Sequence, residues 1–158
     1  MLSSVKGMMQ TLASTLQGLR KPVTKQYPEN PTVLQDKFMG FPGLTWDSKV
    51  EEPFCTGCMV CIRNCPTQCM TASMKDNPKF EQQLTKRRKI VDIFEINLNR
   101  CILCGICVDV CNFDAIVMTH EHEESGTTRD GSRVKLDVLL EMGEKYQKET
   151  NWTPSSES

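Results

Sequence analysis

The stretch Cys55-x-x-Cys58-x-x-Cys61-x-x-x-Cys65-Pro66 dominates this sequence, because the chain contains its spacing a second time. The second copy is Cys101-x-x-Cys104-x-x-Cys107-x-x-x-Cys111, and it begins 46 residues after the first. Each run therefore places three cysteines in one short loop and a fourth cysteine four residues after the third. Together the runs contain eight of the nine cysteines in the 158-residue chain.

This spacing is typical of bacterial-type [4Fe–4S] sites. Three closely spaced thiolates wrap around one cluster, and the fourth cysteine points away from it and binds the cluster of the other run. The sequence thus predicts two [4Fe–4S] clusters. The predicted ligands are Cys55, Cys58, Cys61 and Cys111 for cluster A, and Cys101, Cys104, Cys107 and Cys65 for cluster B.

Two other uses of cysteine fit the pattern less well. A zinc site takes four ligands as two pairs, usually with a longer gap between them, which would leave the third cysteine of each run unused. Disulfides are disfavoured because the number of cysteines is odd and the sequence shows no secretory signal.

Composition limits the fold and its partners. Only 6% of the residues are aromatic, so we expect the clusters to serve as part of a small core. The net charge of −1 argues against binding to nucleic acid, which requires a strong excess of basic residues. We expect an α+β fold: a ferredoxin-like core with two [4Fe–4S] clusters in a pseudo-two-fold repeat, plus extensions. The predicted parts are an N-terminal amphipathic helix (1–21), an extended Pro-rich arm (22–53), the two-cluster domain (54–120) and a C-terminal extension (121–158).

The N-terminal segment carries one apolar stripe at helical spacing, which predicts a helix to about Arg20, ended by Pro22. The stripe is Val5, Met8, Met9, Leu12, Leu16 and Leu19. Polar residues such as Lys6 and Gln10 interrupt it, so it predicts neither a transmembrane span nor a signal peptide. The helix either packs on its own domain or lies on a partner. Its weakly basic polar face favours a protein partner over a membrane surface.

Further elements follow from local patterns. Residues 90–96 and 116–119 are apolar and β-branched, which predicts strands. The leucines 136, 139 and 140 predict a C-terminal helix. The basic run 86–89 predicts a solvated face, with docking to an acidic partner as the alternative.

Aligning the two runs places the ninth cysteine, Cys69, opposite Ala115 and places Pro66 opposite Asn112. We therefore expect Cys69 to fill a small buried position without binding iron, the alternative being a redox-active or spare ligand. Asn112 can offer an N–H that proline lacks. A hydrogen bond from it to cluster A or to Cys111 would raise that cluster's potential.

Beyond the cysteines, the chain resembles the two-cluster iron–sulfur subunit (subunit I) of NADH:quinone oxidoreductase, respiratory complex I. The resemblance extends over roughly residues 5–145. It rests on Pro22-Val23-Thr24 followed by Gln26-Tyr27-Pro28-Glu29, on Phe94-Glu95-Ile96-Asn97 before Arg100-Cys101-Ile102, on Cys104-Gly105, and on Ala115-Ile116 with Met118-Thr119.

The resemblance implies an electron-transfer subunit without catalytic residues or a substrate site of its own. Its two clusters would pass single electrons towards the quinone-reducing site of a proton-translocating enzyme. The N-terminal helix and arm would contact quinone-module and membrane-arm subunits. The protein would then be peripheral, on the cytoplasmic face of the cell inner membrane. The alternatives are a ferredoxin-type subunit of a membrane-bound hydrogenase and a soluble two-cluster ferredoxin.

Overall fold

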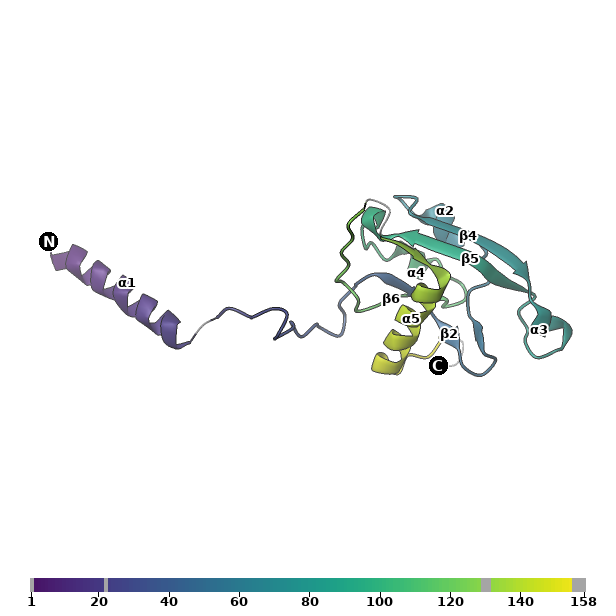
Figure 1. Ribbon diagram of the computed structural model, residues 1–158, viewed down its shortest axis with the longest axis horizontal. Helices are drawn as coiled ribbons and strands as arrows, with labels where there is room; N and C mark the ends of the chain where they lie inside the picture. The colour runs from purple at the N-terminus through teal and green to yellow at the C-terminus, as the bar shows by residue number, and fades with distance from the viewer. Residues whose placement is uncertain (1, 22, 129–131, 155–158) are drawn as a thin grey trace. The chain divides into compact units, whose positions relative to one another are not determined.

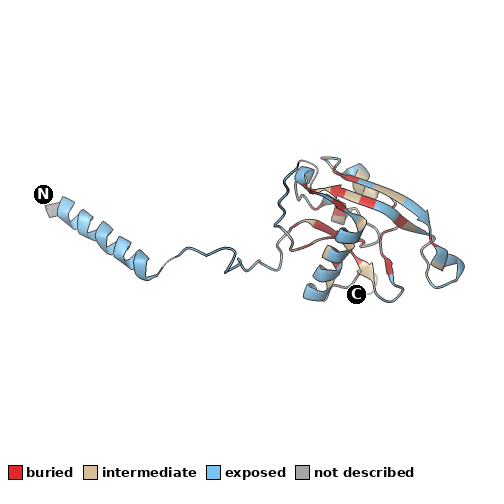
Figure 2. Ribbon diagram, viewed as in Figure 1, coloured by how far each residue is buried: buried red, intermediate tan, exposed pale blue. Residues whose placement is uncertain are grey.

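The computed structural model describes residues 2–21, 23–128 and 132–154, and the chain divides into two units, Met1–Gln35 and Asp36–Ser158. The first unit contains helix α1 (Leu2–Arg20), where the apolar stripe predicts a helix. Pro22, expected to end this helix, lies outside the described residues. All six side chains of the stripe are exposed, as the colouring of α1 in Figure 2 shows.

The second unit is a mixed α and β structure (Figure 1). The predicted strands and C-terminal helix are present as β5, β6 and α5, and the predicted arm contributes β1, β2 and β3 to this unit. Its elements are β1 (Pro42–Leu44), β2 (Trp46–Asp47), β3 (Glu52–Pro53), α2 (Val60–Asn64), β4 (Met70–Asp76), α3 (Pro78–Glu81), β5 (Lys89–Asn97), the 3₁₀ turn η1 (Leu98–Arg100), α4 (Ile106–Asp109), β6 (Ile116–Met118), β7 (Arg133–Lys135) and α5 (Leu136–Thr150).

The largest sheet has the order β4-β5-β7, with both pairs antiparallel. Strand β5 contributes the buried residues Val91, Phe94 and Ile96 to the core, and Met70 of β4 and Val134 of β7 are buried on either side of Ile96. Strand β4 joins the first cysteine run to this sheet, with Met70 opposite Ile96. Sequence analysis did not predict β4, because the apolar residues of this strand alternate with polar ones and form no continuous apolar run.

Helix α5 packs closely on β1, which pairs with β6. A Cβ atom on Gly143 would overlap the backbone carbonyl of Leu44, so only glycine permits this approach. Further along α5, the Gln147 side chain accepts a hydrogen bond from Trp46 N (2.9 Å) and donates one to Trp46 O (3.1 Å). The C-terminal helix therefore holds the segment that leads into the first cysteine run.

A buried carboxylate anchors the insert between the cysteine runs. Glu52 is 1% exposed and accepts hydrogen bonds from Asn77 (2.8 Å), Thr85 (2.6 Å) and Arg87 (2.6 Å). Arg87 also pairs with Asp47 at 2.8 Å. The expectation of a solvated basic run at 86–89 is therefore wrong for Arg87, because two carboxylates draw its guanidinium inward.

Candidate iron–sulfur centres

Two hollows lie among the cysteines, and each receives one cysteine of the run that does not form its loop. The first has about 380 Å³ of unfilled space, including the part open to solvent. Its thiols are Cys55, Cys58 and Cys61 of the first run together with Cys111 of the second. Its apolar walls are Leu44, Met59, Val60, Phe94, Phe113, Ala115 and Ile116.

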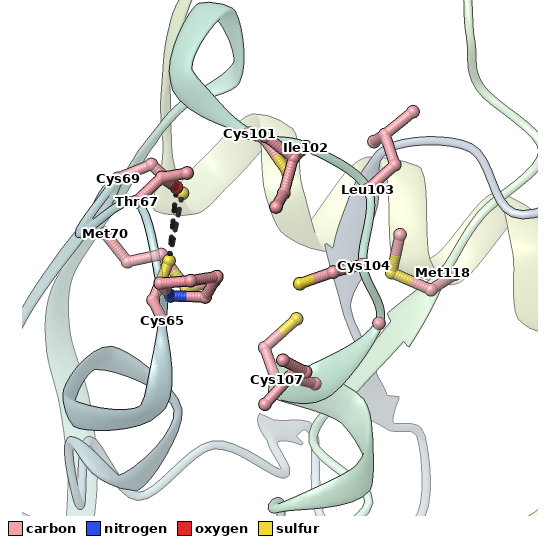
Figure 3. Close-up of a pocket in the computed structure, with 13 residues that line it drawn as sticks. Cys65, Thr67, Cys69, Met70, Cys101, Ile102, Leu103, Cys104, Cys107 and Met118 are labelled. Carbon is pink, nitrogen blue, oxygen red and sulfur yellow. Dashed lines mark hydrogen bonds between the residues drawn. The ribbon is translucent and has the colours of Figure 1, made fainter.

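The second hollow has about 310 Å³ of unfilled space and mirrors the first. Figure 3 shows the sulfur atoms of Cys101, Cys104 and Cys107 facing the same space as that of Cys65, which reaches it from the other run. The ninth cysteine, Cys69, also lines this hollow, beside Cys65. The structure thus brings together both sets of four predicted ligands.

The two runs share their backbone conformation as well as their spacing. In each run, a short helix (α2 or α4) begins five residues after the first cysteine. Left-handed backbone occurs at three positions that match at the 46-residue offset. These are Gly57 (φ 73°) and Leu103 (φ 55°), Met59 (φ 63°) and Gly105 (φ 75°), and Gln68 (φ 49°) and Asp114 (φ 49°).

Each loop has glycine at only one of its first two left-handed positions. The first loop has Gly57 and then Met59, whereas the second has Leu103 and then Gly105. A non-glycine residue in this conformation costs roughly 1–2 kcal/mol. In exchange, the side chains of Met59 and Leu103 line the two hollows and help to keep water out.

The donor set fits iron–sulfur clusters. Burial, followed by the neighbouring cysteines, raises the pKa of Cys55 and of Cys107 to about 12 and that of Cys61 to about 11. Thiolates crowded into an apolar space need a strong positive charge among them, and bound metal supplies it. Among the described residues, no group of three or more His, Cys, Asp or Glu side chains is placed to hold a single metal ion. Four predicted ligands border each open space, the number that a [4Fe–4S] cluster takes.

Cys65 has a different environment from the buried cysteines. Burial raises its pKa, but hydrogen bonds from Thr67 and from Cys69 outweigh that effect and lower the pKa to about 7. The Sγ atom of Cys65 lies 3.5 Å from Thr67 Oγ1 and 3.5 Å from Cys69 Sγ. Cys69 is 6% exposed, which confirms the small buried position predicted for it.

Sequence analysis missed Thr67. Its signal was present in the alignment of the two runs, where Thr67 stands opposite Phe113, just as Cys69 stands opposite Ala115. Unlike the cysteine at 69, a threonine carries no metal-ligand signal of its own in a cysteine-rich motif.

Comparison with known proteins agrees with this geometry. The family model described as a 4Fe-4S dicluster domain matches residues 54–115, which contain both runs. Among solved structures, a chain of the membrane-bound sulfane sulfur reductase, an archaeal respiratory membrane complex, is 22% identical. It covers 85% of this chain and 62% of its own length with a TM-score of 0.48, a likeness too weak to carry an argument.

Curated relatives match most of the chain, and several of them are named NADH-quinone oxidoreductase subunit I 2. The relative from Symbiobacterium thermophilum is 33% identical over 82% of this chain and 51% of its own length. That from Streptomyces coelicolor is 36% identical over 77% and 60%, so this chain spans only about half to three fifths of these two relatives. The Geobacter metallireducens protein is 31% identical over 77% of this chain and 86% of its own length. With four predicted ligands at each of two hollows, and a 31% identical relative of which this chain covers 86%, the chain belongs to the NADH-quinone oxidoreductase subunit I family.

Proposed function

We propose that this chain is an electron-transfer subunit of a membrane-associated NADH:quinone oxidoreductase. In this proposal it carries two [4Fe–4S] clusters and passes single electrons towards the quinone-reducing site. The observation that supports it best is the pair of thiol-lined hollows, each completed by a cysteine from the other run. Cluster A is held by Cys55, Cys58, Cys61 and Cys111, and cluster B by Cys101, Cys104, Cys107 and Cys65.

The clusters supply one-electron chemistry when bound. The chain's residues determine where the clusters lie, how apolar their surroundings are and which hydrogen bonds their ligands receive. The thiolates position the two sites next to each other, because each run contributes to both hollows. Leu44, Phe94 and Ile116 line the first hollow, and their burial makes this part of its surroundings apolar. Backbone N–H groups stabilise the thiolates, as Ala115 N does for Cys111 Sγ at 3.4 Å. The chain would need no substrate site, because NADH oxidation, quinone reduction and proton translocation belong to other subunits.

The two runs have left-handed backbone at matching positions, which supports a pseudo-two-fold arrangement of the cluster-binding halves. The proposed parts of the chain are the N-terminal helix (1–21), the arm (22–53), the two-cluster domain (54–120) and the C-terminal extension (121–158). The arm is divided between the two units of the structure. Only the arm residues up to Gln35 fall in the first unit, because residues from Asp36 onward belong to the second.

The exposed apolar stripe of α1 supports the proposal that this helix contacts partner subunits. Six apolar side chains at 56–78% exposure lie on one helix, and water is a poor environment for such a surface. In the part of the chain that the structure describes, no helix has the length and apolar character to cross a membrane. We propose that α1 and the arm contact quinone-module and membrane-arm subunits, which would hold the protein peripherally on the cytoplasmic face of the inner membrane.

The test is gentle detergent extraction of the native protein, followed by mass spectrometry of the proteins recovered with it. Recovery with quinone-module and membrane-arm subunits is expected. Recovery with a nickel–iron hydrogenase subunit, or as a free brown monomer, would overturn the proposal in favour of a hydrogenase subunit or a soluble ferredoxin. Iron analysis of the same sample should give about eight irons per chain, four for each cluster.

A further inference from the structure

The two remote cysteines, Cys65 and Cys111, differ in the hydrogen bonds that they receive. Cys111 accepts one from the backbone N–H of Ala115 at 3.4 Å. Cys65 has the equivalent backbone bond from Cys69, four residues further on, and a second backbone bond from Thr67. In addition, Cys65 has two side-chain partners, Thr67 Oγ1 and Cys69 Sγ, each 3.5 Å from its sulfur (Figure 3).

The direction of these bonds is fixed once Cys65 binds iron. A thiolate has no proton, so Cys65 can only accept, and the Thr67 hydroxyl and the Cys69 thiol must donate. At the corresponding positions near Cys111 stand Phe113 and Ala115, whose side chains have no donor. The side-chain difference between the two sites therefore lies in these two residue pairs.

Both donors are held in place by backbone contacts outside the hollow. Arg100 donates from Nη2 to the carbonyl of Thr67 at 2.9 Å. The carbonyl of Cys69 accepts from Asn97 N at 2.8 Å, at the start of the β4-β5 pairing. Thr67 is half-buried and Cys69 is buried, so water competes little for their protons.

We propose that Thr67 and Cys69 are positioning residues that raise the reduction potential of the cluster bound by Cys65. Donated hydrogen bonds stabilise negative charge on a cluster's ligands, and reduction adds negative charge, so such bonds favour the reduced state. This inference rests on the proposed function, because it requires Cys65 to be a ligand of cluster B. It also gives Cys69 a role without making it a ligand.

The experiment is a redox titration of the full-length, cluster-loaded chain, followed by electron paramagnetic resonance. Thr67→Val and Cys69→Ala each remove one donor at nearly constant volume. Each should lower one of the two midpoint potentials and leave the other unchanged, and the double variant should lower it furthest. Thr67→Ser and Cys69→Ser, which restore an O–H donor, should recover most of the shift.

Matched controls separate a hydrogen-bond effect from a general disturbance. Thr71→Val makes the same substitution at an exposed position on β4 and should move neither potential. Ala115→Ser places a donor beside Cys111 and should raise the other midpoint, which assigns the two signals.

Two results would overturn the inference. Unchanged potentials in the double variant, with both clusters present, would show that the side-chain bonds do not tune cluster B. Loss of the cluster B signal in Cys69→Ala would show that Cys69 is a ligand. Failure of the proposed function looks different, because wild-type protein would then lack the two [4Fe–4S] signals and about eight irons per chain.

Discussion

Cys111 belongs to the second run, yet it lines the hollow formed by the first. We therefore predict that Cys111→Ala and Cys58→Ala remove the same cluster, and that Cys104→Ala removes the other. Iron content should fall by about half in each variant, since each loses one of two four-iron clusters. Electron paramagnetic resonance spectra identify which signal remains. If Cys111→Ala and Cys104→Ala lost the same signal, the crossed assignment of ligands would be wrong.

Asn112 occupies the position where the first run has Pro66. Its predicted effect is a hydrogen bond to cluster A or to Cys111 that proline cannot make, so Asn112→Pro should lower the potential of cluster A alone. A redox titration of the variant against wild type measures this shift. Pro66→Asn is the matched change in the first run and should raise the potential of cluster B. An unchanged potential in Asn112→Pro would contradict the hypothesis.

Glu52 should make the stability of the protein depend on pH. Burial raises its pKa, but hydrogen bonds from Thr85, Asn77 and Arg87 outweigh burial and hold the pKa below 4.5. Because the folded-state pKa is depressed, the stabilisation is complete above about pH 4.5 and is lost as pH falls through the folded-state value.

The corresponding variant is Glu52→Gln, which should lower the free energy of unfolding by roughly 1.5–3 kcal/mol at pH 7, the scale of hydrogen bonds to a charged group. Urea unfolding of wild type and variant between pH 7 and pH 3 measures the difference. The difference should shrink below pH 4.5. The exposed Glu81→Gln serves as a control, and a Glu52→Gln difference independent of pH would argue against this account.

At the scale of elements, the approach of α5 to β1 depends on Gly143. Gly143→Ala should destabilise the protein by about 1–3 kcal/mol, because the added methyl group overlaps the Leu44 carbonyl and forces the helix outward. Thermal unfolding of the cluster-loaded protein measures the effect. Gly18→Ala, on α1 where nothing lies within 4 Å of the added atom, should be neutral or slightly stabilising. Equal behaviour of the two variants would rule out close packing as the reason for Gly143.

The elements that sequence could predict are those with a local signal. Strand β5 and helix α5 carry their periodicity in their own residues, and the spacing of the cysteines implies their crossed pairing. Strand β4 and the Glu52 network depend on partners far along the chain. Glu52 and Arg87 are 35 residues apart, and nothing in the local sequence shows that they meet. Thr67 lies between these two cases, because its own position in the sequence carries no signal but comparison of the two runs singles it out.

At the scale of the whole molecule, the two units should have separable roles. All nine cysteines lie in the second unit, whereas the exposed apolar stripe lies on α1 in the first. A chain lacking residues 1–20 should therefore keep about eight irons but lose recovery with partner subunits. Co-purification from detergent extracts measures the second effect. A full-length Leu12→Ser/Leu16→Ser variant should show the same loss, and undiminished recovery of both would contradict the proposed role of α1.

The glycine in each of the two cysteine loops lies where another segment of the chain packs closely against that loop. A Cβ on Gly57 would lie 3.0 Å from Met74 Cβ on β4, and one on Gly105 would lie 2.6 Å from Met39 Cε. If the loops exchanged sequences, leucine would stand at 57, against Met74 Cβ and the Ser73 carbonyl of β4, and methionine would stand at 105, where the flexible end of Met39 would have to move. The two halves of this repeated motif are thus fitted to different neighbours, a strand backbone for the first loop and a flexible methionine side chain for the second.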